Sequence, residues 1–305
     1  MSTTLEARGS EGDGAGGTSR RRSYQLHAWS FTAPGVVWVF AFTIFPLAHT
    51  LYLSLQSTGL GGNRFVGLRN FVRLWRDYRF WSALRLTLTF VAVSVVVTVV
   101  VGTVLALAVN RGVRGTRVFR TLSILPMFAA PIALGYLGLT IFYQQGGPIN
   151  NVLAAVGLRP VPWLSDGRWA LVSILAVDVW QWTPFVFLVV LAALQNVPAE
   201  LLEAARIETS SSWPVLTRIT FPLIRGPLGT VIILRIVEAF KVFDIPFTLT
   251  NGGPGLATRS LTYDVYTTGL RNQNFGYAAS IAVVMLVLVM VVAIVFYRSY
   301  GSTYE

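Results

Sequence analysis

Six long apolar stretches are the feature that most limits how this chain can fold. A helix that crosses a bilayer needs about 20 mostly apolar residues. Its backbone N–H and C=O groups must bond inside the segment, because hydrocarbon offers them no partner. The sequence therefore predicts an all-α, polytopic membrane protein. Its six transmembrane helices are expected at about 29–55, 86–109, 119–143, 169–193, 226–248 and 277–298.

The composition agrees with this class. Hydrophobic residues make up 54% of the 305 and charged residues only 12%, whereas a soluble domain has about 25% charged residues. The chain has no cysteine, which excludes disulfides and thiolate chemistry, and its two histidines, His27 and His49, are too few for a histidine metal cluster. No catalytic or metal site is predicted, and the chain is not expected to be an enzyme.

The net charge of +11 comes from arginines scattered among short loops. This distribution is typical of loops that contact lipid head groups, so lipid is an expected partner and nucleic acid is not. Lys241 is the only lysine and lies in an apolar stretch. A P-loop needs a lysine directly after its glycines. The chain therefore has no P-loop, and any ATP would be bound by a partner.

The ends and loops predict the organisation of the chain. Residues 1–28 have no apolar period and are expected to be a disordered cytoplasmic tail. Residues 29–298 form the membrane domain, and 299–305 a short cytoplasmic tail. An even number of spans places both termini on the same side of the membrane. The arginines in the short loop after residue 110 indicate that this loop is cytoplasmic. Arginines and aromatic residues alternate within 56–85, which predicts an interfacial helix lying flat.

Prolines interrupt several of the stretches, among them Pro126 and Pro131 in the third and Pro184 in the fourth. In a bundle, neighbouring helices satisfy the freed carbonyl groups and the helix bends. The sequence therefore predicts kinked helices here. Kinked, partly polar helices usually face a pathway, whereas uniformly apolar ones face lipid.

Four charged residues recur every three positions through the fifth stretch: Arg235, Glu238, Lys241 and Asp244. Neighbours three apart on a helix can touch, so a chain of ion pairs over about 13 Å of helix rise is expected. An ionisable side chain at the bilayer centre costs about 2.5–3.5 kcal/mol, so the four must face the bundle or water. Either they fix helix packing, or they line a translocation path.

Two further places carry candidate path residues. Asp178, Gln181 and Trp182 share one helix face, and an aromatic ring beside polar groups is typical of a sugar pocket. The alternative is that Asp178 and Gln181 hydrogen-bond to neighbouring helices. Asn251 begins an Asn-Gly-Gly-Pro sequence, which predicts a turn after the fifth stretch.

The loop between the fourth and fifth stretches, 198–222, predicts two short helices. Pro198 suits the first turn of the first helix and Pro214 the start of the second, while Pro222 is expected to end the second. The first helix should carry an apolar side formed by Leu201, Leu202, Ala204, Ala205 and Ile207, and a polar side formed by Glu200, Glu203 and Arg206.

The run from Glu203 to Glu208 (Glu-Ala-Ala-Arg-Ile-Glu) resembles the EAA loop of ABC importer permeases, the element that docks on the ATPase subunit. Thr209 stands where that family usually has glycine. The sequences at 65–71, 249–254 and 276–280 are similar to the carbohydrate-uptake branch of the family, the maltose and glycerol-phosphate type. The resemblance covers nearly the whole chain after the tail.

The resemblance implies the type I permease fold of ABC importers, in the inner (plasma) membrane. Expected partners are a second homologous permease, two ATPase subunits that hold ATP and Mg²⁺, and an extracytoplasmic substrate-binding protein that delivers a sugar or related polyol. The coupling residues would be Glu203, Ala204, Ala205, Glu208, Thr209 and Pro222. The chain would form half of the translocation pore.

Two other classes of protein remain as alternatives. A proton- or sodium-coupled transporter would use Glu238, Asp244 and Asp178 as ion sites, and would be expected to contain two related halves. No such repeat is visible. An intramembrane enzyme would have to rely on Asp178 and Asp244 without supporting motifs.

Overall fold

The computed structural model describes residues 32–58, 62–110, 112, 115–209 and 211–301. The chain divides into two compact units, Met1–Tyr52 and Leu53–Glu305. The expected tail 1–28 lies outside the described residues. Of the expected tail 299–305, the first three residues instead complete the last helix, α14 (Phe275–Gly301).

The first unit contains most of one apolar helix, Thr32–Ser54, which is long enough to cross a membrane. A π-helical segment, η1 (Phe40–Ile44), leads into α2 (Phe45–Ser54), and Pro46 is the second residue of α2. In an α-helix a proline ring clashes with the carbonyl four residues earlier. The wider π turn, in which the Phe45 N–H bonds to the Phe40 carbonyl, accommodates that ring without ending the helix.

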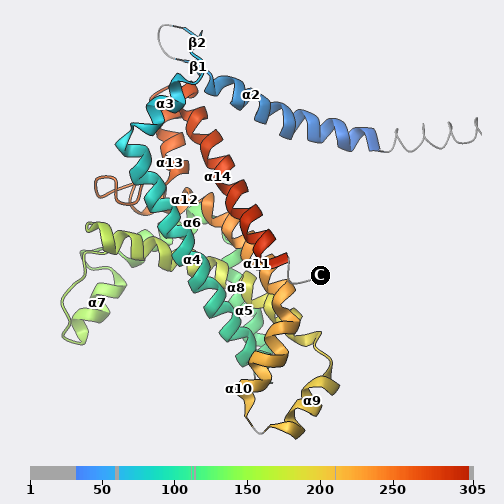
Figure 1. The fold of residues 1–305 in the computed structure, drawn as a ribbon. Helices are drawn as coiled ribbons and strands as arrows, with labels where there is room; N and C mark the ends of the chain where they lie inside the picture. Colours follow the sequence, from blue (N-terminus) through green and yellow to red (C-terminus); the bar gives the residue numbers. More distant parts are fainter. Residues whose placement is uncertain (1–31, 59–61, 111, 113–114, 210, 302–305) are drawn as a thin grey trace, which may run out of the picture. The chain divides into compact units, whose positions relative to one another are not determined.

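The second unit is built on three long helices, α4 (Tyr78–Asn110), α8 (Gly167–Gln195) and α14. With Thr32–Ser54, these are the four single helices among the described residues that are long and apolar enough to cross a membrane. They correspond to the first, second, fourth and sixth predicted spans. Figure 1 shows α4 and α14 running along the second unit. The short helices α9 (Ala199–Glu208) and α10 (Ser212–Val215) lie at one end of it, and α3 (Arg69–Trp75) lies at the other.

The third predicted span is sharply bent rather than kinked. It consists of α5 (Thr116–Phe128) and α6 (Pro131–Ile141), whose axes differ by 101°. Ala129 and Ala130 between them have extended backbones. A residue before proline is biased away from helical angles, and Ala130 precedes Pro131. The bend therefore falls at the second proline, while Pro126 remains inside α5.

The fifth predicted span, 226–248, is wrong at its C-terminal end. Its helix, α11 (Phe221–Phe240), stops at Phe240, and a separate helix, α12 (Asp244–Leu249), begins four residues later. Phe243 between them has non-helical angles. The charged residues recur every three positions across this break, so the charge pattern did not indicate that the helix ends there.

The helix predicted within 56–85 is shorter than that range. A short antiparallel hairpin of β1 (Gln56–Ser57) and β2 (Arg64–Phe65) comes first. It is followed by the seven-residue α3 (Arg69–Trp75), and residues from Tyr78 onward already belong to α4. Gly62 and Gly67 have positive φ angles of 84° and 56°, which break the helical pattern before α3.

Two close helix contacts depend on glycine. Gly102 lets α4 approach α8, where an added Cβ would lie 2.7 Å from the Val186 Cβ. Gly135 lets α6 approach α12, because a Cβ there would lie 1.7 Å from Thr248 Oγ1. Small residues at such contacts are common in membrane bundles, where packing replaces the hydrophobic effect.

The remaining short elements are α7 (Pro148–Ala155), α9 (Ala199–Glu208), α10 (Ser212–Val215), η2 (Leu216–Thr220), α13 (Leu261–Tyr266) and η3 (Thr267–Arg271).

Candidate coupling loop and translocation path

The helix α9 lies at one end of the second unit (Figure 1). Pro198 is its N-cap and Glu208 its last residue. Ala205 is buried, whereas Glu203 and Ala204 are exposed. Leu201 and Ile207, from the predicted apolar side, are 46% and 88% exposed. An exposed carboxylate flanked by exposed apolar side chains is typical of a surface that a partner covers.

Thr209 directly follows α9 in an extended conformation, with φ −146° and ψ 134°. Any residue can adopt these angles; glycine is needed only where φ is positive. The threonine hydroxyl oxygen accepts a hydrogen bond of 3.2 Å from the Ser211 N–H. The threonine therefore fits the backbone at this position without strain and adds one bond to the turn.

Thr209→Gly is accordingly expected to leave transport-coupled ATP hydrolysis within about twofold of wild type. The substitution removes one exposed hydrogen bond, worth about 0.5–1.5 kcal/mol, and relieves no backbone strain. The rate stimulated by substrate-loaded binding protein, measured on the reconstituted complex, checks this. A severalfold rise in the glycine variant would show that threonine restrains coupling after all.

Pro222 does not end the second helix of the loop, contrary to prediction. The helices α10, η2 and α11 are continuous from Ser212 to Phe240. The π-helical segment η2 stands directly before Phe221-Pro222, as η1 stands before Phe45-Pro46, and the Phe221 N–H bonds to the carbonyl five residues earlier. The widened turn accommodates the proline ring. The loop is therefore joined to α11 by unbroken helix.

An open pocket of about 160 Å³ lies between the 198–222 loop and the ends of α4 and α8. Leu202 and Thr209 line it from the loop, and Leu107 and Leu194 from the two long helices. The loop therefore does not pack fully against the two long helices here.

Asp178 and Arg235 form a buried ion pair that joins α8 to α11. Arg235 Nη2 lies 2.6 Å from Asp178 Oδ2, and the two residues are 0% and 3% exposed. Ser94, on α4, donates to the same carboxylate oxygen and accepts from Arg235 at 2.5 Å. Three helices therefore meet at one polar centre. The arrangement matches the alternative in which Asp178 bonds to neighbouring helices.

The other two residues of the predicted face have different neighbours. The Trp182 ring lies under the Arg235 guanidinium, with 5.1 Å from the Arg235 Cζ to the ring centroid. This is within cation–π range. Gln181 is 4% exposed and donates to the Ala129 carbonyl, at 3.5 Å. That carbonyl lies at the bend between α5 and α6, so Gln181 contacts the broken span rather than Asp178.

The predicted chain of ion pairs reduces to one pair. Lys241 Nζ lies 2.6 Å from Glu238 Oε1, with side chains 56% and 38% exposed. Arg235 pairs with Asp178 instead, and Asp244 begins α12. The i, i+3 geometry holds only while the helix continues, and α11 ends before Lys241. Glu238 and Lys241 form an exposed polar end of α11.

An aromatic cluster adjoins this end, formed by Phe243, Phe247, Tyr263 and Tyr266 with ring centroids 5.2–6.3 Å apart. The Tyr263 hydroxyl donates to the Asn251 backbone and side-chain oxygens, each at 2.8 Å. Asn251 has a φ of 50° and occupies the predicted turn. The sequence contains these residues, but only the fold shows that their rings form one group.

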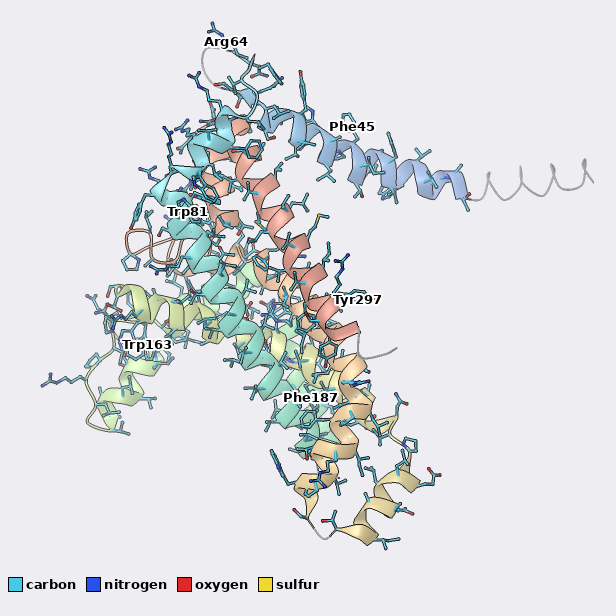
Figure 2. The ribbon with its side chains drawn as sticks, viewed as in Figure 1. Phe45, Arg64, Trp81, Trp163, Phe187 and Tyr297 are labelled. Carbon is cyan, nitrogen blue, oxygen red and sulfur yellow. The ribbon has the colours of Figure 1, made fainter. Side chains whose placement is uncertain are left out.

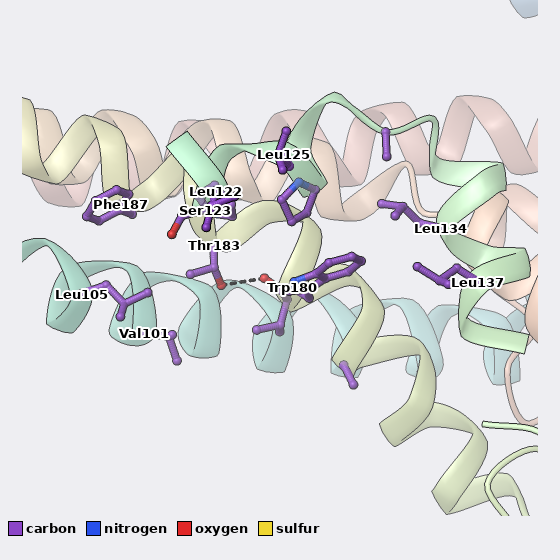
Figure 3. Close-up of a pocket in the computed structure, with 15 residues that line it drawn as sticks. Val101, Leu105, Leu122, Ser123, Leu125, Leu134, Leu137, Trp180, Thr183 and Phe187 are labelled. Carbon is purple, nitrogen blue, oxygen red and sulfur yellow. Dashed lines mark hydrogen bonds between the residues drawn. The ribbon is translucent and has the colours of Figure 1, made fainter. Parts of the chain in front are cut away.

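A separate apolar pocket of about 750 Å³ lies among α4, α5, α6 and α8. Leu122 and Leu125 line it from α5, and Trp180 and Phe187 from α8 (Figure 3). The Thr183 hydroxyl, also in the lining, donates to the Val179 carbonyl of its own helix. No charged side chain belongs to this lining. Its chemistry fits hydrocarbon better than a sugar.

Comparison with known proteins gives consistent relatives. Residues 98–301 match the family model of the binding-protein-dependent transport system inner membrane component. The chain is 35% identical over 266 residues to a trehalose/maltose transport system permease protein of Thermococcus litoralis, covering 85% of this chain and 88% of the relative. It is 33% identical over 283 residues to a lactose transport system permease protein of Rhizobium radiobacter, covering 90% and 94%.

Solved structures show the same fold. One chain of a bacterial ABC transporter involved in the import of the acidic polysaccharide alginate superposes with a TM-score of 0.82 and 22% identity. The match covers 94% of this chain and 99% of that chain. The chain therefore has the same fold as that chain.

Proposed function

Because the chain belongs to the family of binding-protein-dependent transport system inner membrane components, and is thus a multi-pass permease subunit of an ABC importer rather than an enzyme, we propose that its cargo is a sugar or related polyol. The observation that carries this proposal is the likeness, over most of both chains, to permeases named for trehalose/maltose and for lactose. No step of covalent chemistry is assigned to the chain.

The coupling surface of the proposal is α9. Glu203 would bond to the ATPase subunit, with the exposed Ala204 and Ile207 beside it in the interface. The unbroken helix through Pro222 would carry a push on the loop into α11. Movement of α11 would then shift Arg235 relative to Ser94 on α4 and Asp178 on α8. Ala205, Glu208 and Thr209 would shape the end of the docking helix.

The cargo path is proposed at the polar end of α11. Glu238, Lys241, Asp244 and Asn251 offer carboxylates, an amine and an amide that are only partly buried or exposed. The neighbouring aromatic cluster offers ring faces. Hydrogen-bonding groups beside aromatic rings suit a sugar, which has a polar edge and an apolar face. Asp178, Arg235 and Gln181 are buried and bonded to other helices, so we assign them to helix packing, with Trp182 beside Arg235.

The proposed assembly contains a second homologous permease and two ATPase subunits, which would bind ATP and Mg²⁺, together with a binding protein that delivers the cargo. Both termini and the loop around α9 would be cytoplasmic, in the inner (plasma) membrane. The dependence on a binding protein follows from the family; the number of subunits and the orientation are part of the proposal.

Uptake of labelled sugars into vesicles tests the proposed function. The permease would be reconstituted with its partner subunits and binding protein, and maltose, trehalose, lactose and glycerol 3-phosphate supplied one at a time. We expect uptake of at least one of them only with ATP and the binding protein present, and no effect of a protonophore or of sodium. Uptake driven by an ion gradient without ATP would instead establish a secondary transporter.

A further inference from the structure

A strongly basic groove of about 560 Å³ lies where α3 meets α4, at the opposite end of the second unit from α9 (Figure 1). It is lined by Arg69, Val72, Arg73, Arg76, Asp77 and Arg79. Three of the arginines recur at i, i+4 and i+7, so they share one helix face. Neither the coupling loop nor the proposed cargo path uses this groove.

The four guanidinium groups have no carboxylate partner within the part of the chain that the structure describes. The carboxylate in the lining, Asp77, is already bonded: Oδ2 accepts from the Tyr277 hydroxyl at 2.7 Å, and Oδ1 from the Arg79 N–H at 2.9 Å. Arg73 lies over the Tyr277 ring, 4.6 Å from its centroid. Four exposed positive charges around one groove repel one another, and a bound anion would relieve that repulsion.

The groove is held in a fixed shape by its anchoring residues. The Asn70 side-chain amide donates to the Ser54 and Gln56 carbonyls, at 2.8 and 2.7 Å. Leu74 and Phe80 are each 2% exposed and pack into one apolar cluster. The α3 helix therefore presents its arginines from a rigid base. Guanidinium groups can form the paired hydrogen bonds that phosphate oxygens accept.

The length of α4 places the groove at the level of lipid phosphates. Its 33 residues span about 50 Å at 1.5 Å per residue, whereas the hydrocarbon core is about 30 Å thick. Arg79 and Arg85 keep the first turns out of the hydrocarbon, and Arg79 lies about 9 Å along the axis before Arg85. The polar layer on each side of the core is about 5–8 Å deep. With Arg85 at the boundary of the hydrocarbon, the first turn of α4 thus lies at the outer edge of the head-group layer.

Exposed aromatic rings surround the groove at this level. Trp75 and Tyr78 are 70% and 77% exposed, and Trp81 is 40% exposed (Figure 2). Tryptophan and tyrosine collect at membrane–water interfaces, where one end of each ring system is apolar and the other wet. The combination of depth, aromatic rings and unpaired arginines favours lipid over an acidic protein surface.

We propose that this groove binds the phosphate of an anionic phospholipid. Arg69, Arg73, Arg76 and Arg79 hold the phosphate oxygens, and the acyl chains lie along the apolar surface of α4 below them. The ligand class is a phospholipid whose phosphate monoanion is not balanced by a cationic head group, in the leaflet that adjoins the α3 end of the protein. The bound lipid fixes the joint between α3 and α4.

The test measures which lipids the purified complex retains. The complex is delipidated, mixed with vesicles of one part phosphatidylglycerol to nine parts phosphatidylcholine, and re-isolated, and its lipids are counted by mass spectrometry. Wild type is expected to prefer phosphatidylglycerol, and Arg69→Gln/Arg76→Gln to lose roughly tenfold or more of that preference. The matched control is Arg64→Gln/Arg159→Gln, since both arginines are exposed and outside the groove; it should behave as wild type.

Three outcomes would overturn the proposal. The first is an unchanged preference in Arg69→Gln/Arg76→Gln. The second is displacement of the lipid by inorganic phosphate, which would identify a soluble anion. The third is weaker binding of the substrate-binding protein with lipid preference intact, which would identify a protein partner. If the double variant fails to assemble, Arg79→Gln alone serves as the second variant and should lose roughly fivefold.

Discussion

Asp178→Ala is expected to lower the free energy of unfolding by about 3–5 kcal/mol, the cost of breaking a buried ion pair by removing one partner. The Arg235 guanidinium is 0% exposed and would keep its charge without a carboxylate. Its Nη1 already has no hydrogen-bond partner among the described residues. Ser94 and Trp182 would remain beside it, but neither carries a neutralising charge. Thermal unfolding of the purified protein in detergent measures the loss.

Two variants make this test decisive. Glu238→Ala also removes the acid of an ion pair on α11, but that pair is exposed and should contribute less than about 1 kcal/mol. Asp178→Leu/Arg235→Met removes both buried charges and should recover most of the stability that Asp178→Ala loses, because paired apolar groups of similar size often replace a buried ion pair without cost. Equal effects of Asp178→Ala and Glu238→Ala would contradict the role assigned to the buried centre.

The apolar stretches predicted the membrane class and the positions of the helices, because length and hydrophobicity are local properties. The breaks were harder. Charges every three residues across 235–244 predicted one continuous helix, yet α11 ends at Phe240. The partner of Arg235 lies 57 residues earlier in the chain, and a local pattern contains no information about such a pairing. The sharp bend at Ala129 was likewise underestimated as a kink.

Some of the missed features did leave a signal in the sequence. Ser94 and Thr98 are one helical turn apart in an almost purely apolar stretch, and both bond to Arg235. Two hydroxyls on one face of such a span indicate a polar partner on a neighbouring helix. Similarly, Phe-Pro occurs once inside the first apolar stretch and once at the end of the 198–222 loop, and each is preceded by a π-helical segment. A proline at these places thus indicated that the helix would be altered locally, but not that a π-helical turn would form.

Glu203→Ala is expected to lower binding-protein-stimulated ATP hydrolysis by roughly tenfold or more, the effect of losing one charge-assisted hydrogen bond of about 1.5–3 kcal/mol at an interface. The residue is exposed on α9, so its removal should not disturb the fold, and the complex should still assemble. Uptake should fall in the same proportion, since the loop is the proposed route of force into α11. The assay is ATP hydrolysis by the full complex in lipid, with and without loaded binding protein.

The matched control is Glu200→Ala, which removes an exposed carboxylate one turn earlier on the same helix. Both variants remove one negative charge from α9, but only Glu200 lies in its first turn, where a carboxylate interacts favourably with the helix dipole. A larger loss in Glu203→Ala therefore cannot come from net charge or from the dipole. A tenfold loss in Glu203→Ala with near-normal activity in Glu200→Ala would assign the contact to Glu203. Equal, small losses would show that the carboxylate is only a surface group, and the docking contact would then have to be sought elsewhere in 198–222, with the exposed Ile207 and Trp213 as the next positions to change.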